Sequence, residues 1–542
     1  MFAMKKRLFI RLAGALFVLF LFYTWGCGEP SPYQGMGLKI AAGSESKEIE
    51  PLIRQFAEKH KCDIHIEYKG SVDMMLDLAS PGCPYDAVLP ANSMWIRLGD
   101  KSLHRTSDEA SIMRSPVVLG VKKSLAQRLG WIGKDVAVAD ILAAVRAGDL
   151  HFAMTSATQS NSGASAYMGL LYAFAGRPQV LESSHLMDPS LNKDIRDILG
   201  GIERSSGSSG WLKDLYIKKA DSLDAMYNYE AMVIAANQEL TRQGKEPLYV
   251  IYPVDGLAIA DSTLAFVNKQ GNGDKKPLFL ALRDYLLSPE VQKEIFRTGF
   301  RTGLIGMNPE DVDKKVYNPN WGVDLNRTIS PITWPRPDVI QQALTLYQTE
   351  FRKPSFTVYL LDVSGSMRGE GLPQLKKAMT GLLDPQSAEK FMLQTGRNDA
   401  TVVVAFSDGP RPVAHMEGNA PNELRRVMGE IHALNANGGT NIYAAVQQAL
   451  VIMKQNSERM EGSLPSVILM TDGKSNKGSL DELMQQWRAL NAPFALPPVF
   501  GVTFGEADDA QLKELAELTS ARVFDGRKHG LMHAFRSAKG YN

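Results

Sequence analysis

A short polar cluster closes an apolar run in the second half of the sequence. The stretch FTVYLLDVSGSM begins at Phe356 with apolar residues of strand length and then reaches Asp362 and the hydroxyls of Ser364 and Ser366. Carboxylate and hydroxyl oxygens suit a small, hard cation such as Mg²⁺, which takes oxygen ligands. The same side chains would also suit a simple loop in which a serine caps the following helix, LPQLKKAMTGLL.

Two later segments favour the cation. NGGTNIY supplies Thr440, and SVILMTDGKSN supplies Asp472 at the end of another apolar run. The three segments together resemble the von Willebrand factor type A domain with a metal-ion-dependent adhesion site. The resemblance implies a Mg²⁺ ion, or alternatively Mn²⁺ or Ca²⁺, in direct contact with Ser364, Ser366 and Thr440. It implies that Asp362 and Asp472 often act through water.

A site of this kind leaves one coordination position for an acidic side chain of a protein partner, so the resemblance implies protein binding or adhesion. Motifs of enzymes are missing: the sequence has no GxxxxGK[ST], HExxH or GxSxG, and its nine histidines are scattered. We therefore predict that the protein is not an enzyme. The alternative is a type A domain that works with a ring ATPase inside the cell, which requires that the first 27 residues are not an export signal.

The elements that position these residues are strands of a parallel sheet. The carboxyl ends of neighbouring parallel strands share one edge, so residues that are distant in the sequence meet there. VVVAFSDG and PPVFGVTFG supply further strands, and amphipathic helices lie between them. We predict a doubly wound, Rossmann-like α/β domain over residues 356–542.

The first half of the chain also alternates strands and helices, which indicates an α/β fold. LKIAAG is followed by GSES and a helical pattern, and HFAMTSATQSNSGASAYMGLLYAFAG repeats the order of strand, hydroxyl-rich loop and helix. With YKGSVDM, YDAVLPANSMW, YNYEAMVI, YPVDG and LLSPEVQKEIFRTGFR, these motifs resemble bacterial extracellular solute-binding proteins. The resemblance implies the type 2 periplasmic binding fold, in which two lobes enclose a cleft.

In that family the ligand is held by hydroxyls and by free N–H groups at helix N-termini, which favour anions. The alternative is that these residues are ordinary N-caps and turn residues. These loops contain no arginine that could bind a carboxylate in a bidentate manner, so the ligand could be a small oxyanion or a polar metabolite. Glu230 and Asp255 are further candidates, for a cationic or hydroxylated ligand. The candidate cleft residues are Ser44, Ser46, Ser71, Ser160, Asn161 and Ser162.

The first residues predict export. Four basic residues, Lys5, Lys6, Arg7 and Arg11, bracket the start of an apolar stretch that ends in Gly26 and Cys27. This resembles a bacterial lipoprotein signal, in which Cys27 becomes the lipidated N-terminus; the alternative is an uncleaved helical anchor. Either places the protein on the outer face of a bacterial membrane, in the cell envelope or periplasm.

Two further cysteines, Cys62 and Cys83, are then outside the reducing cytosol. A disulfide between them would close a loop of about 20 residues and add roughly 3 kcal/mol. The alternative is two separate buried thiols.

Composition is that of a globular protein of several domains, with 542 residues of which 44% are hydrophobic. Lys and Arg number 60 against 59 Asp and Glu, for a formal charge of +1, which argues against a nucleic-acid partner. We predict a cell-envelope binding protein; the alternative is the substrate-binding component of a transport or sensing system for a small polar or anionic solute. The predicted parts are a signal peptide or anchor (1–27), a linker (28–37), a two-lobed solute-binding-like domain (38–305), a connector (306–355) and a type A domain (356–542).

Overall fold

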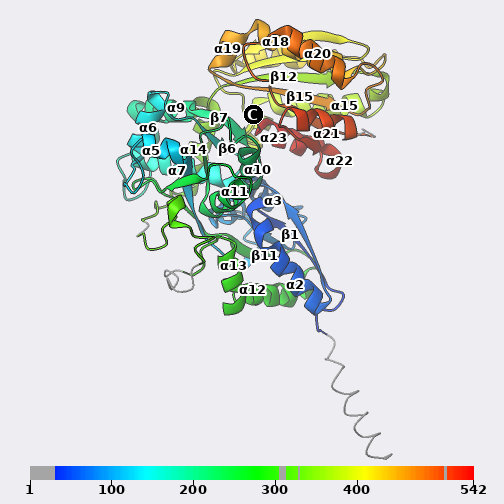
Figure 1. The fold of residues 1–542 in the computed structure, drawn as a ribbon. Helices are drawn as coiled ribbons and strands as arrows, with labels where there is room; N and C mark the ends of the chain where they lie inside the picture. Colours follow the sequence, from blue (N-terminus) through cyan, green and yellow to red (C-terminus); the bar gives the residue numbers. More distant parts are fainter. Residues whose placement is uncertain (1–30, 304–312, 328–329, 506–508, 542) are drawn as a thin grey trace, which may run out of the picture.

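The computed structural model describes residues 31–303, 313–327, 330–505 and 509–541, and within them three β-sheets. Two sheets belong to the two lobes of the first domain, and the third forms the core of a second domain that sits against both lobes (Figure 1). The predicted α/β class is confirmed. Cys27 and the rest of the predicted signal lie outside the described residues. None of the described helices combines the length and the apolar character needed to cross a bilayer.

The sheet of lobe one has the strand order β2-β1-β3-β11-β4. β1 pairs in parallel with β2 and β3, whereas β11 is antiparallel to β3 and β4. The strands are β1 (Gly37–Ala42), β2 (Asp63–Tyr68), β3 (Ala87–Leu89), β4 (Thr106–Ser111) and β11 (Thr263–Val267). The helical elements are η1 (Ser44–Ile49), α2 (Glu50–His60), α3 (Ser71–Ala79), α4 (Met94–Gly99), η2 (Gly273–Lys275), α12 (Lys276–Leu286) and α13 (Pro289–Arg297).

The sheet of lobe two has the order β10-β5-β8-β6-β7, with β9 paired to β5. Its strands are buried almost throughout, because helices cover both faces. The strands are β5 (Ser115–Lys122), β6 (Phe152–Thr155), β7 (Ile202–Ser206), β8 (Ala225–Tyr229), β9 (Leu248–Ile251) and β10 (Ile259–Ala260). The helices are α5 (Lys123–Arg128), α6 (Val138–Arg146), α7 (Asn161–Phe174), α8 (Ser183–Leu186), α9 (Pro189–Gly200), α10 (Ser209–Lys218) and α11 (Glu230–Arg242).

The third sheet has the order β14-β13-β12-β15-β16-β17, and only β14 runs antiparallel. One hydrophobic cluster joins the sheet to α15, α17 and α23, and another joins its opposite face to α18, α20 and α21. The strands are β12 (Ser355–Asp362), β13 (Ala400–Phe406), β14 (Pro410–Glu417), β15 (Leu464–Thr471), β16 (Val499–Thr503) and β17 (Val523–Asp525). The helical elements are η6 (Gly365–Met367), α15 (Gly371–Leu383), α16 (Pro385–Lys390), α17 (Pro421–His432), α18 (Ile442–Gln455), α19 (Ser457–Glu461), α20 (Leu480–Leu490), α21 (Asp509–Leu518), α22 (Gly526–His529) and α23 (Leu531–Lys539).

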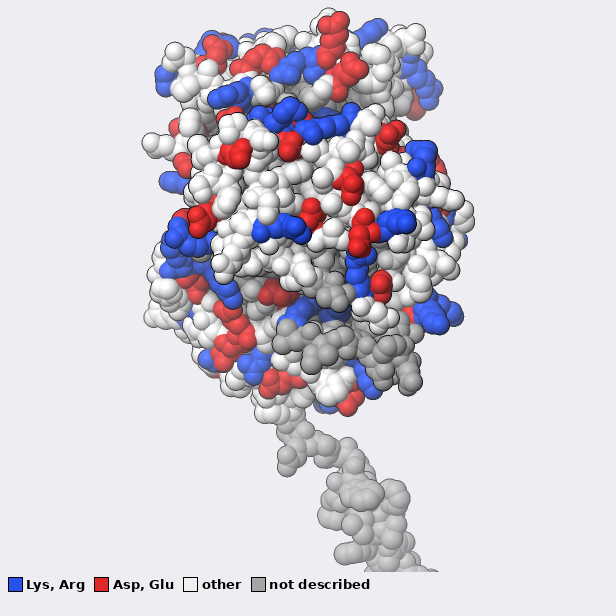
Figure 2. Space-filling view, turned by 90° about the vertical axis from the view of Figure 1, so that its left-hand side faces the viewer, with Lys and Arg blue, Asp and Glu red and all other residues white. Residues whose placement is uncertain are grey.

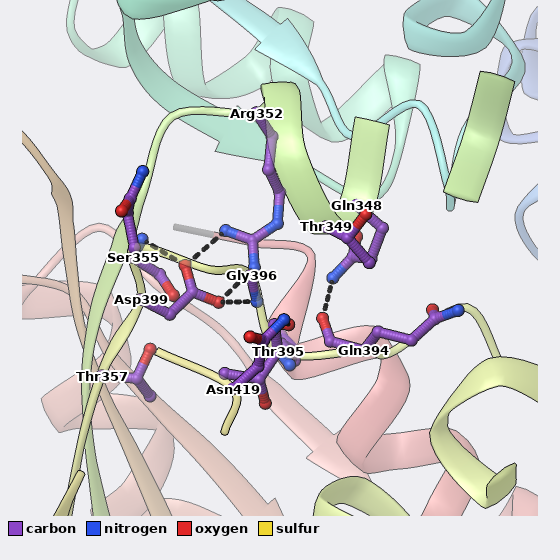
Figure 3. Close-up of polar contacts among 12 residues, drawn as sticks. Gln348, Thr349, Arg352, Ser355, Thr357, Gln394, Thr395, Gly396, Asp399 and Asn419 are labelled. Carbon is purple, nitrogen blue, oxygen red and sulfur yellow. Dashed lines mark hydrogen bonds and ion pairs between the residues drawn. The ribbon is translucent and has the colours of Figure 1, made fainter. Parts of the chain in front are cut away.

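The described part of the connector between the two domains is irregular before Pro337, apart from one 3-10 turn, and helical from there to Phe351. After η4 (Pro319–Trp321) come α14 (Pro337–Leu346) and a π-helical turn, η5 (Tyr347–Phe351), which leads directly into β12. Here Arg352 forms a buried ion pair with Asp399 of the second domain (Figure 3). The side chain of Gln348 also donates to the carbonyl of Gln394 at 2.8 Å. The connector is therefore fixed to the second domain by polar contacts.

Basic and acidic side chains are interspersed over the face shown in Figure 2, on both domains. This mixture agrees with a formal charge close to zero, and it gives that face no extended field of one sign.

Candidate functional sites

The five candidate metal ligands lie at the carboxyl edge of the third sheet. Asp362 ends β12, and Asp472 follows β15, its parallel neighbour. The Asp362 carboxylate is fully buried and is fixed by two bonds: Oδ1 accepts from the amide of Ser364 at 2.8 Å, and Oδ2 accepts from the hydroxyl of Thr471 at 2.6 Å. Asp362 therefore has one orientation, set by both strands.

The hydroxyls extend this arrangement towards the second carboxylate. The Ser364 and Ser366 hydroxyl oxygens lie 3.0 Å apart, and Ser366 donates to Asp472 Oδ1 at 2.8 Å. A Cβ atom placed on Gly473 would lie 3.5 Å from the Ser366 hydroxyl and 4.0 Å from that of Thr440. The structure thus brings all five predicted residues to one place.

The site carries negative charge without a counter-charge in the part of the chain that is described. Neither Asp362 nor Asp472 forms an ion pair there, and burial raises the pKa of both carboxyls. At the rim, Lys477 binds the exposed Asp408 at 2.7 Å instead. No group of three or more His, Cys, Asp or Glu side chains that could hold a metal ion occurs among the described residues. Two carboxylates with three hydroxyls fit a hard divalent cation that takes oxygen ligands.

A second candidate site is a cavity of about 330 Å³ between the lobes of the first domain. It is large enough for a small solute. Ser44, Ser71, Ser160 and Asn161 line it, as the sequence predicted. Two other predicted residues do not line it: Ser46 is buried beside it, and the Ser162 hydroxyl bonds to that of Thr155 at 2.8 Å.

The two lobes are in contact around this cavity. Ser44 of lobe one accepts hydrogen bonds from the Ser208 hydroxyl at 2.9 Å and from the Gly210 amide at 3.1 Å. The Trp95 indole of lobe one donates to the Asn161 side chain of lobe two at 2.7 Å. The structure is therefore that of closed lobes.

Sequence reasoning missed Glu45, which lies between the two serines of the GSES loop. Its side chain is only 4% exposed, lines the cavity and accepts from the Ser209 hydroxyl at 3.1 Å. Burial raises its pKa to about 6, although hydrogen bonds to the carboxylate partly oppose the shift. The acidic residue inside a serine-rich loop was a signal that could have identified it.

Glu230 and Asp255 do not act in the cavity. Glu230 is fully buried and forms an ion pair with Arg301 at 2.7 Å, and the Tyr252 hydroxyl donates to the same carboxylate. The Asp255 carboxylate accepts from the amide of Val138, the first residue of α6, at 2.9 Å. Both carboxylates therefore have structural partners.

The predicted disulfide is not formed, because Cys62 and Cys83 are both free thiols. Cys83 is buried in a small cluster with Leu78 and Tyr85, whereas Cys62 packs against the main core of the first domain. The Cys62 thiol contacts the carbonyl of Ala57 at 3.8 Å, at the end of α2. The two cysteines belong to separate hydrophobic clusters, so they are two separate thiols, of which Cys83 is buried and Cys62 is half-buried.

Two family models match the chain, one for each half. The model of the bacterial extracellular solute-binding protein matches residues 38–301, and the model of the von Willebrand factor type A domain matches residues 358–536. The chain joins a solute-binding domain to a type A domain. Both are families of binding domains, and the extracellular family implies export from the cytoplasm.

Curated relatives match less than a third of this chain. Inter-alpha-trypsin inhibitor heavy chain H4 of Homo sapiens is 31% identical over 168 residues, which are 30% of this chain and 17% of that protein. The Bos taurus protein of the same name is 28% identical over 156 residues, which are 28% of this chain and 16% of its own. The chain thus spans about one sixth of the length of the curated relatives it matches.

Solved structures resemble parts of the chain. A von Willebrand factor type A protein from Catenulispora acidiphila has a TM-score of 0.30 and 21% identity, over 35% of this chain and 44% of its own. The sulfate-binding protein SubI from Mycobacterium tuberculosis has a TM-score of 0.38 and 17% identity, over 51% of this chain and 88% of its own.

Proposed function

We propose that this protein is a membrane-anchored binding protein of a bacterial cell envelope, which uses a divalent cation in the type A domain to bind a partner protein. The observation that carries the proposal is the group of two carboxylates and three hydroxyls at one sheet edge, with no counter-charge among the described residues. Ser364, Ser366 and Thr440 would hold the ion directly, and Asp362 and Asp472 would balance its charge. A bound Mg²⁺ supplies an open position for an acidic side chain of the partner.

Metal binding is tested by thermal unfolding of residues 28–542 with Mg²⁺, Mn²⁺ or Ca²⁺ and with a chelator. A ligand at about 100 times its dissociation constant adds about 2.7 kcal/mol, so a metal-dependent rise in melting temperature is expected. Asp362→Ala should abolish the rise. Asp481→Ala, which changes an exposed aspartate of the same domain, should keep it. An equal response of wild type and Asp362→Ala would refute the metal site.

A second candidate function is capture of a small polar or anionic solute for transport or sensing. The cavity between the lobes supports it, since the N-caps of two helices, Gly70 of α3 and Ser160 of α7, line that cavity. Free N–H groups at helix N-termini attract anions.

Calorimetric titration with inorganic phosphate and sulfate tests this function. Binding of at least one anion at millimolar or lower concentration is expected. Ser44→Ala should weaken it, whereas Ser46→Ala, in the same loop but outside the cavity lining, should not. A wild-type protein that binds neither anion would exclude the solute function in this form.

A further inference from the structure

The outer wall of the solute cavity is built by the type A domain. Besides residues of both lobes, the cavity is lined by the end of the type A sheet and by the last helix of the chain. Arg522 precedes β17, and Tyr541 follows α23. In Figure 1 the C-terminus lies between the type A domain and the lobes. The cleft of the first domain is thus covered by a segment more than 200 positions away in the sequence.

A buried ion pair fixes this arrangement. Arg536 of α23 is 1% exposed and binds the carboxylate of Asp73 in lobe one. It also donates to the carbonyl of Thr158 in lobe two at 2.6 Å. In return, the Gln159 side chain donates to the backbone carbonyl of Arg536. One side chain therefore contacts both lobes, and its charge is buried only while the domains are docked.

Further contacts join lobe two to the type A domain. Arg204 and Lys218 of lobe two donate to the carbonyls of Ser520 and Glu517, at 3.2 and 3.0 Å. The ring of Trp211 meets that of Tyr541 edge-on, with centroids 4.9 Å apart. The docked position of the type A domain is therefore specified by lobe two as well as by lobe one.

Three charged side chains in the cavity lining form no ion pair within the described residues: Lys47 of lobe one, which lies over the ring of Tyr68, Arg522 of the type A domain, and Glu45. Arg522 lies over the rings of Phe524 and Tyr541 and donates to the Tyr541 hydroxyl at 3.1 Å, but it contacts no carboxylate. Glu45 also lines the cavity, and its oxygen Oε1 is buried and receives no hydrogen bond from the part of the chain that is described. A buried acceptor of this kind is costly unless a ligand supplies the missing donor.

We propose that the solute site is shared between the two domains and takes a small anion that also carries a hydrogen-bond donor. Arg522 of the type A domain supplies the positive charge, and Glu45 of the solute-binding domain accepts the hydrogen bond. This proposal rests on the solute function proposed above and adds the specificity of the site. At neutral pH, hydrogen phosphate has both a negative charge and a hydrogen-bond donor, whereas sulfate has the charge and the shape but no donor.

The experiment is calorimetric titration of residues 28–542 with inorganic phosphate and with sulfate. Wild type is expected to bind phosphate at least tenfold more tightly than sulfate, and Glu45→Gln should narrow this preference because an amide can also donate to sulfate. Arg522→Gln should weaken phosphate at least tenfold. Arg522→Lys should recover most of the affinity, since it keeps the charge, and it controls for loss of packing. Arg488→Gln, an exposed arginine of α20, should bind as wild type does.

The outcomes separate the two proposals. If wild type binds neither anion, the solute function itself fails, and the shared site fails with it. If wild type binds phosphate but Arg522→Gln binds equally well, the solute function stands and the type A domain has no part in the site. If wild type binds sulfate as tightly as phosphate, Glu45 does not select for a hydrogen-bond donor on the ligand, and the proposed ligand class is wrong.

Discussion

The buried ion pair at the connector provides a prediction whose size follows from the structure. The Asp399 carboxylate is 2% exposed and accepts two hydrogen bonds from Arg352, one of them at 2.9 Å. It also accepts from the amides of Ser355 at 2.9 Å and Gly396 at 2.7 Å (Figure 3). Although burial alone would raise it, the charge of Arg352 and these bonds lower the pKa of Asp399 to about 2.

The sign and the size of the contribution of Asp399 to stability follow from this pKa. A carboxylate with a depressed folded pKa stabilises the protein above its unfolded pKa of 3.8, and the contribution is lost as pH falls from there through about 2. At about 1.4 kcal/mol per pH unit, the contribution of Asp399 to the free energy of unfolding is on the order of 2 kcal/mol. Asp399→Asn also leaves the Arg352 guanidinium buried without a partner, so we expect it to cost about 3 kcal/mol at pH 7.

Urea unfolding between pH 7 and pH 2.5 measures both effects. The variant should be less stable at pH 7 and should lose less stability than wild type on acidification. Asp338→Asn is the control, because Asp338 forms an exposed ion pair with Arg336 in the same connector and should change little. A loss below about 1 kcal/mol at pH 7, or an acid response equal to that of wild type, would refute the proposed contribution.

Three further outcomes are expected. Glu45→Gln should raise the free energy of unfolding at pH 7 by up to about 2 kcal/mol, because a pKa raised from 4.5 to about 6 means that the stability of wild type falls as pH rises through this interval. The same variant should weaken the preference for phosphate over sulfate. Unfolding curves at pH 4.5 and pH 7 measure the stability effect, and equal curves for both proteins would contradict it. Burial lowers the pKa of Lys539 to about 7, so wild type should gain stability from pH 7 towards pH 10, and Lys539→Met should remove that gain in the same assay. Arg536→Gln leaves Asp73 without its ion-pair partner and should separate calorimetric unfolding into two transitions, one for each domain; a single unchanged transition would show that the domains are not held by this pair.

The sequence predicted what depends on local patterns. Asp362 and Asp472 could be placed at one edge because each ends an apolar run, and neighbouring parallel strands end side by side. Ser44 and Ser160 could be placed near a cleft because each precedes a helix in a strand–loop–helix unit. The separate environments of Cys62 and Cys83 depend on side-chain packing, which no spacing encodes.

The domain junction could not be predicted for a different reason. Arg536 lies in an amphipathic helix, where an arginine normally faces solvent, and nothing around it in the sequence indicates a buried partner. Its partner, Asp73, is equally ordinary in the first turn of α3. Contacts between such residues follow from how two finished domains dock, and only three-dimensional structure reports them.

The docking also connects the two candidate sites through one rigid element. Thr471 is paired with Thr503, and Thr503 with Asp525. The sheet edge that carries the candidate metal ligands and the strand that lines the cavity therefore belong to one row across the sheet. With strands about 4.8 Å apart, Asp362 and Asp525 are separated by about 14 Å. A solute that binds only the docked form would hold this edge in a fixed position relative to the lobes. The solute can change the affinity for a partner at the candidate metal site by no more than the ratio of the solute affinities of the docked and undocked forms. The partner must change the affinity for the solute by the same factor.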